Sequence, residues 1–170
     1  MDHPDAGVAE ASRLAEIFTE QRPSLLRVAV LLVGDQPTAE DVVQEAFLGL
    51  QRRWRSLRQP AAARAYARQS VVNGCHSVLR RRAVASRFRI PHEPAVWSAE
   101  SAAILSEERQ EVLRALERLP PRRREVLVPR FYLDLNDAEI AYTMGISEAT
   151  VRSTAVRALR TLGHLLGETP

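Results

Sequence analysis

The sequence predicts an all-α protein made of two small helical domains joined by a linker. Apolar residues recur at helical spacing along almost all of the 170 residues, and no convincing alternating strand pattern interrupts them. Residues 89–98 contain two prolines and little periodicity, which is typical of a linker between two periodic halves. We therefore expect one domain over residues 10–88 and a second over residues 99–167.

Three helices are expected in the first domain. A periodic stretch that includes Leu14 continues as far as Gly34, which ends the helix. Thr38 can cap the next helix with its hydroxyl, and acidic residues in that first turn suit the helix dipole. Pro60 suits the first turn of a third helix, which extends to about Arg82.

The second domain should begin with a helix over residues 99–119, followed by a corner at two adjacent prolines and then another helix. Pro129 lies inside that later helix, where a proline removes one hydrogen bond and kinks or breaks the helix at a cost of about 3 kcal/mol. The sequence therefore leaves the helix geometry between Arg122 and Leu135 open.

The pattern of residues 136–153 predicts a helix-turn-helix. The Asn136 side chain can cap one helix while Glu139 reaches back to it, and Gly145 supplies the positive φ that ends this helix. Ser147 can then cap a second helix. Taken alone, the pattern fits either a DNA-reading helix or an ordinary helical hairpin with solvated arginines.

The formal net charge of +3 conceals an uneven distribution of charge along the chain. Residues 51–92 carry eleven arginines and no acidic residue, whereas residues 35–45 carry four acidic residues and no basic one. A polyanionic partner for the first stretch and a basic partner for the second follow from this asymmetry.

Composition also limits the chemistry and the compartment. Cys75 is the single cysteine, which excludes an internal disulfide and points to a reducing compartment. The four histidines are scattered without metal-ligand spacing, so we expect no metal and no cofactor. The chain has neither a signal pattern nor an apolar run near the roughly 20 residues of a membrane span. A soluble, cytoplasmic protein without membrane contact is expected.

Several stretches of the sequence resemble bacterial sigma factors. "TAEDVVQEAFL" (38–48), with "VVN" (71–73) and "LRRR" (79–82) further on, resembles sigma region 2, and residues 119–162 resemble region 4. In this order they cover most of residues 14–166 and resemble the two-domain extracytoplasmic-function (group IV) type of the sigma-70 family. The resemblance implies a transcription initiation factor that binds core RNA polymerase, directs it to specific promoters and assists promoter opening.

The resemblance also implies where the polymerase binds. The acidic helix of region 2 would dock on the polymerase clamp helices through Asp41, Gln44 and Glu45. From the residues alone, acids placed at a helix start to stabilise its dipole account for the same pattern. The region 4 helices resemble the surface that binds the polymerase flap tip, and an anti-sigma protein is a further partner that the resemblance allows.

For promoter DNA, the resemblance implies two separate sets of contacts. The melted non-template strand of the −10 element would contact the arginine-rich part of region 2, with Asn73 reading a base edge. This set comprises Arg55, Ser56, Arg58, Arg64, Arg68, Asn73, Arg80 and Arg81. Trp54 and Tyr66 could face the melted strand, although their helical spacing also fits core positions.

The duplex −35 element would receive the second helix of the helix-turn-helix in its major groove. The residues implied to contact bases are Glu148, Arg152, Ser153 and Thr154. The residues implied to hold phosphates are Arg157, Arg160 and the cluster Arg122 to Arg124.

Two other functions compete with this interpretation. A stand-alone helix-turn-helix repressor or activator would explain residues 136–160 but would leave the acidic motif "EDVVQEAF" and its basic neighbour without a role. A nuclease would need a metal-binding carboxylate cluster or an activated nucleophile, and the acidic residues are instead scattered along helices. We therefore do not expect an enzyme.

Overall fold

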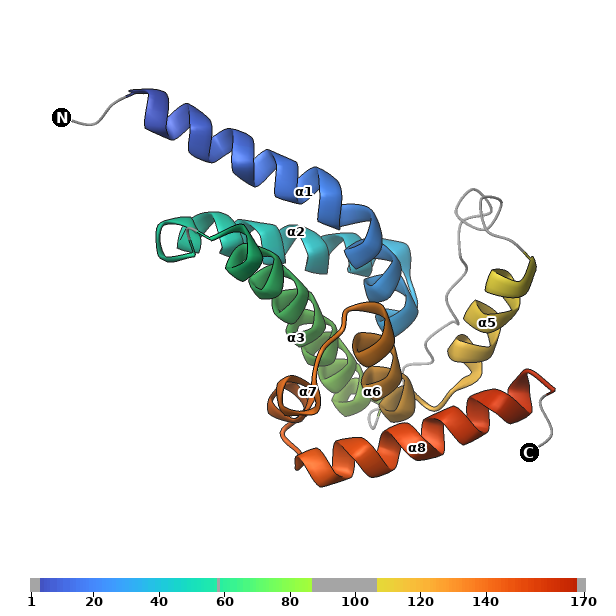
Figure 1. Ribbon diagram of the computed structural model, residues 1–170. Helices are drawn as coiled ribbons and strands as arrows, with labels where there is room; N and C mark the ends of the chain where they lie inside the picture. The colour runs from blue at the N-terminus through green and yellow to red at the C-terminus, as the bar shows by residue number, and fades with distance from the viewer. Residues whose placement is uncertain (1–3, 58, 87–106, 168–170) are drawn as a thin grey trace.

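The computed structural model describes residues 4–57, 59–86 and 107–167, and this part of the chain is helical with no strand (Figure 1). The all-α prediction is confirmed. The elements are α1 (Pro4–Val33), α2 (Gln36–Arg53), the short 3-10 helix η1 (Trp54–Ser56), α3 (Pro60–Ser86), α5 (Glu107–Arg118), α6 (Pro121–Tyr132), α7 (Asp137–Met144) and α8 (Glu148–Leu165). The predicted linker, residues 89–98, lies outside the described residues, and the domain boundaries stay predictions.

Helices α1, α2 and α3 pack against one another as a three-helix bundle (Figure 1). Gly34, with a φ of 87°, makes the turn from α1 into α2. Burying a large apolar side chain contributes about 1.5–3 kcal/mol, and the three helices bring many such side chains together. The buried set includes Leu25, Val28, Leu32, Val43, Leu50, Trp54, Val71 and Cys75.

The cap of α2 differs from the sequence prediction. The helix begins at Gln36 and its cap is Asp35, whose carboxylate accepts a hydrogen bond from the Thr38 backbone N–H at 2.9 Å. Asp35 has extended backbone angles, as a capping residue requires, whereas Thr38 already lies in the first helical turn. Both residue types cap helices well, which is why local sequence did not separate them.

Arg82, near the end of α3, ties this turn to the rest of the bundle. Its guanidinium donates hydrogen bonds to the Val33 carbonyl at 2.5 Å, the Asp35 carboxylate at 2.6 Å and the Thr38 hydroxyl at 3.0 Å. Burial opposes ionisation of Asp35, but hydrogen bonds from Thr38 and Arg82 outweigh it and lower the pKa of this carboxyl.

Replacing Arg82 with methionine should therefore destabilise the bundle by about 2 kcal/mol, because hydrogen bonds to a charged, half-buried group are lost together. The measurement is urea unfolding followed by circular dichroism. The matched control is Arg81→Met, since Arg81 is exposed on the same turn. Equal losses in the two variants would show that the contacts of Arg82 do not hold the turn.

Glycine allows α2 and α3 to approach closely at two positions. A Cβ added at Gly74 would lie 2.8 Å from Cγ1 of Val42, and one added at Gly49 would lie 2.9 Å from the Tyr66 hydroxyl. Both distances are shorter than van der Waals contact, so any side chain at these positions would force the helices or their side chains apart. Gly74 inside α3 is thus explained by packing.

The second unit consists of α5 to α8, and α6 continues through Pro129 to Tyr132. Pro129 lies in the last turn and is buried, and its carbonyl accepts hydrogen bonds from the N–H groups of Leu133 and Leu135, both at 3.2 Å. A proline so close to the end of a helix removes one hydrogen bond without interrupting a long helix. The helix is therefore neither ended nor broken at Pro129.

The helix-turn-helix has the predicted local structure. Asn136 and Glu139 form a reciprocal capping box, with N–H to side-chain oxygen distances of 2.9 and 2.8 Å. Gly145 has a φ of 63° and ends α7, and the Ser147 hydroxyl accepts from the Thr150 N–H at 3.1 Å to begin α8. These caps fix where α7 ends and where α8 begins.

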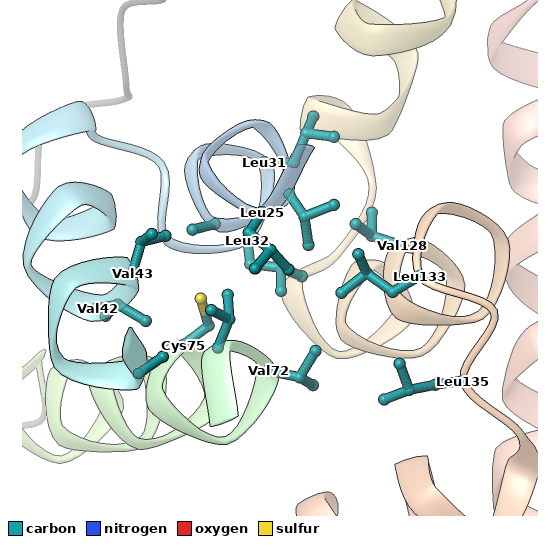
Figure 2. Packing of buried hydrophobic residues seen from close by; sticks show 14 of the residues in the cluster. Leu25, Leu31, Leu32, Val42, Val43, Val72, Cys75, Val128, Leu133 and Leu135 are labelled. Atoms are coloured by element: carbon teal, nitrogen blue, oxygen red, sulfur yellow. The ribbon is translucent and has the colours of Figure 1, made fainter. Parts of the chain in front are cut away.

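The two helical units share one continuous apolar cluster. Helix α1 packs on α6, and α3 packs on α7. In Figure 2, Leu31 and Leu32 of α1 lie beside Val128 of α6, while Val72 of α3 lies on the side toward Leu135. The second unit is therefore seated on the first through buried side chains.

Cys75 is 1% exposed within this cluster. Burial, and to a lesser extent the charge of the nearby Glu125 carboxylate, raises the pKa of its thiol to about 12. The unfolded thiol ionises near pH 8.5, whereas the folded thiol stays protonated. Above that pH the unfolded chain binds fewer protons than the folded chain, so folding stability should fall as the pH rises toward 12.

Between pH 8 and pH 10, the free energy of unfolding should decrease by about 2 kcal/mol on account of this one thiol. The change can be measured by urea unfolding at several pH values. The variant Cys75→Ala should lose this part of the pH dependence, whatever its stability at neutral pH. An unchanged slope in Cys75→Ala would contradict the assignment to the thiol.

Candidate polymerase and nucleic-acid interfaces

The exposed face of α2 carries acidic and amide side chains. Asp41, Gln44 and Glu45 are exposed, and the opposite face of the helix packs in the bundle core. Their spacing of three and four residues places the three side chains next to one another. The structure therefore brings together all three residues that were predicted to bind the polymerase. Glu45 also pairs with Arg52 at 2.8 Å in an exposed ion pair.

Leu48 extends this acidic face with an apolar side chain. It follows Gln44 by four positions and is 41% exposed, although its neighbour Phe47 is buried. It was not among the predicted residues, because leucine in an amphipathic helix is usually a core residue. The signal that would have identified it is its position on the same face as Asp41. We define the acidic face as Asp41, Gln44, Glu45 and Leu48.

An apolar groove between α1 and α2 adjoins the acidic face. It has a volume of about 820 Å³ and is lined by Leu14, Phe18, Phe47 and Leu48, among others. The rings of Phe18 and Phe47 meet edge to face with centroids 4.8 Å apart, and Phe18 is 39% exposed. A partner that contacts the acidic face would therefore also meet apolar surface.

The predicted −10 residues are spread along η1 and α3. Arg55 and Ser56 are exposed in η1, and Arg80 and Arg81 are exposed near the end of α3. Arg64, Arg68 and Asn73 are half-buried between these two ends, and Arg58 lies outside the described residues. Arg80 follows Arg64 by sixteen positions, which correspond to about 24 Å along a helix. The basic side chains thus follow a path along α3 and do not form one compact cluster.

Two aromatic residues beside this path differ in their surroundings. Trp54 is buried in the bundle core, so it does not face a melted strand. Tyr66 is half-buried, and the exposed Arg53 guanidinium lies 5.7 Å from its ring centroid. Arg53 was not among the predicted residues.

Arg64 is paired with Glu20 at 2.6 Å, and hydrogen bonding from Arg64 is the main cause of the lowered pKa of Glu20.

Asn73 lies on the side of α3 that faces the second helical unit. Its side-chain oxygen accepts hydrogen bonds from Gln69 at 3.0 Å and from the Thr143 hydroxyl of α7 at 2.6 Å. The predicted base reader of one unit is therefore in contact with the helix-turn-helix of the other.

The outer face of α8 presents most of the predicted −35 residues to solvent. Glu148, Arg152, Ser153, Arg157 and Arg160 are exposed. Arg152 lies 3.6 Å from the Glu148 carboxylate and 3.7 Å from the carboxylate of Asp137 on α7. Both are ion-pair distances, and the Arg152 side chain is 56% exposed.

One of the predicted base contacts, Thr154, is buried in the structure. It is only 5% exposed, because it lies on the stripe of α8 that packs inward with Val151, Ala155 and Ala158. The position lies at the edge of the helix face, where spacing alone places a residue poorly. Val156, 57% exposed, occupies the outer face instead. A small apolar side chain there can contact a thymine methyl group, a role that sequence analysis did not assign.

Two of the three arginines at the start of α6 form hydrogen bonds within the protein. Arg122 is exposed, but Arg123 donates to the Thr161 hydroxyl at 2.6 Å and Arg124 donates to the Glu117 carbonyl at 2.9 Å. Burial lowers the pKa of Arg124, although the charges of Glu117 and Glu125 oppose that shift. Arg122 is thus the most accessible member of the cluster for a phosphate.

Among residues 4–57, 59–86 and 107–167, no group of three or more His, Cys, Asp or Glu side chains is placed to hold a metal ion. Within the same ranges, the helices are too short or too polar to span a bilayer.

The fold combines a helix-turn-helix, an arginine-rich helix and an exposed acidic face on α2. Comparison with protein families gives the class: residues 17–84 match Sigma-70 region 2, and residues 109–162 match Sigma-70, region 4. The ECF RNA polymerase sigma factor SigL of Mycobacterium tuberculosis is 33% identical over 175 residues, which cover 96% of this chain and 96% of SigL. The RNA polymerase sigma-E factor of Streptomyces coelicolor is 29% identical, covering 91% and 86% of the two chains.

Solved structures agree with the fold. The sigma factor RpoE from Bartonella quintana, solved in complex with the anti-sigma factor NepR, matches with a TM-score of 0.65 and 22% identity over 91% of this chain and 99% of that chain. The extracytoplasmic-function sigma factor SigJ of Mycobacterium tuberculosis matches with a TM-score of 0.58 and 26% identity, over 88% of this chain and 53% of SigJ.

The chain belongs to the extracytoplasmic-function family of RNA polymerase sigma factors. It is a transcription initiation factor of the class that binds core RNA polymerase and promoter DNA, and not a stand-alone repressor. The recognition of the family from its two motifs is thereby confirmed.

Proposed function

We propose that this sigma factor divides its work among three surfaces: the acidic face of α2 binds core polymerase, α3 with η1 holds the melted −10 element, and α8 reads the −35 element. The observation that carries the proposal is the acidic face itself, because the neighbouring segment is the most basic part of the chain. Asp41 and Glu45 lie beyond the first turn of α2, so stabilisation of the helix dipole does not explain these exposed carboxylates beside a basic surface.

On the acidic face, the side chains are suited to a basic helical partner such as the polymerase clamp helices. Asp41 and Glu45 supply negative charge, Gln44 supplies a donor and an acceptor, and Leu48 supplies an apolar contact. The groove beside Phe18 widens the apolar part of this surface. Charges at the rim would steer the encounter, and the apolar centre would hold the complex.

Along α3, the proposed −10 contacts combine charge with one base-reading amide. Arg55, Arg80 and Arg81 are exposed and can hold phosphates of a single strand. Asn73 carries both a donor and an acceptor, so it can pair with the edge of a base that has left the stack. Such a surface binds an opened strand better than a duplex.

At the −35 element, we assign base contacts to Arg152, with Glu148 and Ser153 beside it. A guanidinium presented in front of a recognition helix can donate two hydrogen bonds to a guanine in the major groove. Arg157 and Arg160 follow along α8 and are exposed toward the flanking phosphates. Thr154 is left out of this assignment because it is buried.

The remaining parts of the proposal concern partners and chemistry. The factor acts without catalytic chemistry of its own, in the cytoplasm, where polymerase and promoters are found. The second unit, α5 to α8, also contacts the polymerase flap tip. An anti-sigma protein is a further partner; the relative from Bartonella quintana was solved with one.

The test is in vitro transcription with sigma-free bacterial core polymerase on a fragmented genomic library, followed by sequencing of the RNA starts. The proposal expects specific starts that share two upstream motifs at a fixed spacing. Starts without the upstream pair would contradict the assignment of two DNA readers. Absence of starts, together with tight specific binding by the protein alone, would contradict the requirement for polymerase.

A further inference from the structure

A cavity of about 770 Å³ lies where α1, α3 and α6 meet (Figure 1). Small-molecule sites in proteins enclose roughly 300–1,000 Å³ and often lie between domains, so both the size and the position of this cavity suit a ligand. It shares no lining residue with the groove between α1 and α2 that adjoins the acidic face.

The walls of the cavity are largely aliphatic. Leu31 and Val33 of α1 and Leu79 of α3 line it, and Met144 of α7 adds a side chain that adapts to irregular shapes. Among the described residues that line the cavity, none is Phe, Tyr or Trp, so there is no ring on which a nucleobase could stack. These walls therefore suit an aliphatic ligand better than a nucleotide.

The charged residues of the cavity leave an excess of positive charge, because four arginines and two glutamates line it. Glu125 lies within hydrogen-bond distance of His76, and Arg82 already donates to groups of the turn between α1 and α2. By contrast, Arg80 of α3 and Arg122 of α6 are exposed, and among the described residues neither has an ion-pair partner. Two guanidinium groups are thus available to an anion.

Arg124 adds a buried donor to the wall of the cavity. One of its terminal nitrogens donates to the Glu117 carbonyl, but its Nε is buried and has no hydrogen-bond partner among the described residues. Burial lowers the pKa of this guanidinium, and the nearby carboxylates only partly oppose that shift. Buried donors without a partner are uncommon, and an anion close to Arg124 would stabilise its charged form.

We propose that this cavity binds a small aliphatic carboxylate, with its chain against Leu31, Val33 and Leu79 and its head group at Arg80 and Arg122. The planar guanidinium can donate two parallel hydrogen bonds to a carboxylate, which matches this head group in shape as well as in charge. The aliphatic walls remove the chain of the ligand from water.

Occupation of the cavity has a consequence for the DNA contacts described above. Arg80 is assigned to the −10 element, and Arg122 is the member of its cluster most accessible to a phosphate. A carboxylate bound to both would neutralise cations that otherwise contact DNA, so the ligand would compete with the promoter. This consequence rests on the proposed function, whereas binding of the ligand does not.

The experiment titrates the full chain with octanoate and follows the heat of binding by calorimetry, with octanol and acetate as matched probes. Octanol has the same chain without the charge, and acetate has the charge without the long chain. Octanoate should bind at least about tenfold more tightly than either probe, because the head group and the chain both contribute.

Two variants locate the site. Arg80→Met/Arg122→Met should lower the affinity for octanoate about tenfold and leave the affinity for octanol unchanged. Ala83→Phe places a ring at the exposed edge of the cavity and should weaken binding of both probes. The matched control is Arg118→Met, since Arg118 is exposed on α5 and does not line the cavity; it should bind octanoate as the wild type does.

Absence of octanoate binding to the wild type would overturn the proposal. Equal affinities for octanoate and either matched probe would overturn it too, because the head group or the chain would then contribute nothing. Wild-type affinity for octanoate in the double arginine variant or in Ala83→Phe would show that the ligand binds elsewhere. The titrations contain neither polymerase nor DNA, so a failure of the proposed function would leave their outcome unchanged.

Discussion

Replacing both Arg152 and Arg157 with alanine is expected to reduce transcription from the factor's own promoters at least about 30-fold. A bidentate arginine contact to a base discriminates by about 1–3 kcal/mol, and a phosphate contact adds a further electrostatic contribution. Both side chains are exposed on α8 and contribute little to packing, so the loss should come from DNA binding. Multiple-round transcription by reconstituted holoenzyme at fixed salt concentration measures it.

The single variants distinguish the two roles. Arg152→Ala should relax the preference at one position of the −35 element, whereas Arg157→Ala should weaken binding to all sequences and lower the salt dependence. Arg27→Ala serves as the control, because Arg27 is an exposed arginine of α1 far from the helix-turn-helix in sequence. A loss of similar size in the Arg27 variant would show that net positive charge, and not the face of α8, determines activity.

Reversing the charge of Asp41 with arginine should weaken binding to core polymerase about 100-fold. The substitution removes an attraction and places a like charge against a basic partner, which costs several kcal/mol at a protein interface. Asp41 is exposed, so the fold should be retained, and binding of the isolated protein to −35 duplex should not fall. Competition between labelled wild type and unlabelled variant for core polymerase gives the affinity.

Glu16→Arg is the matched control for Asp41→Arg. It makes the same change of charge at an exposed position of α1 that lies outside the acidic face. Leu48→Ala tests the apolar part of the interface and should weaken binding by a smaller factor. If Glu16→Arg and Asp41→Arg compete equally well, the acidic face does not bind the polymerase.

Local signals explain why the helices were predictable from sequence. Asn136, Glu139 and Gly145 act within a few residues of one another, so their caps can be recognised without knowing the fold. The acidic face was also predictable, because exposure of Asp41 and Glu45 follows from helix periodicity once the apolar side is known. The base contact predicted for Thr154 was wrong, because this residue lies at the boundary between the buried and exposed sides of α8 and is itself buried.

Long-range features were not predictable in the same way. Thr143 contacts Gln69 and Asn73 across 74 and 70 positions, and no local pattern connects them. The exposure of Leu48 and the pairing of Arg64 with Glu20 likewise depend on how whole helices pack. Periodicity gives the inner side of a helix but not the neighbour that it meets.

The burial of Cys75 has a consequence for how the factor can respond to oxidants. Peroxides and disulfides react with thiolate, and a thiol with a pKa of about 12 is almost entirely protonated at neutral pH. The folded chain offers no other cysteine for such a reaction. Oxidants that act on thiolates should therefore leave Cys75 reduced for as long as the chain stays folded.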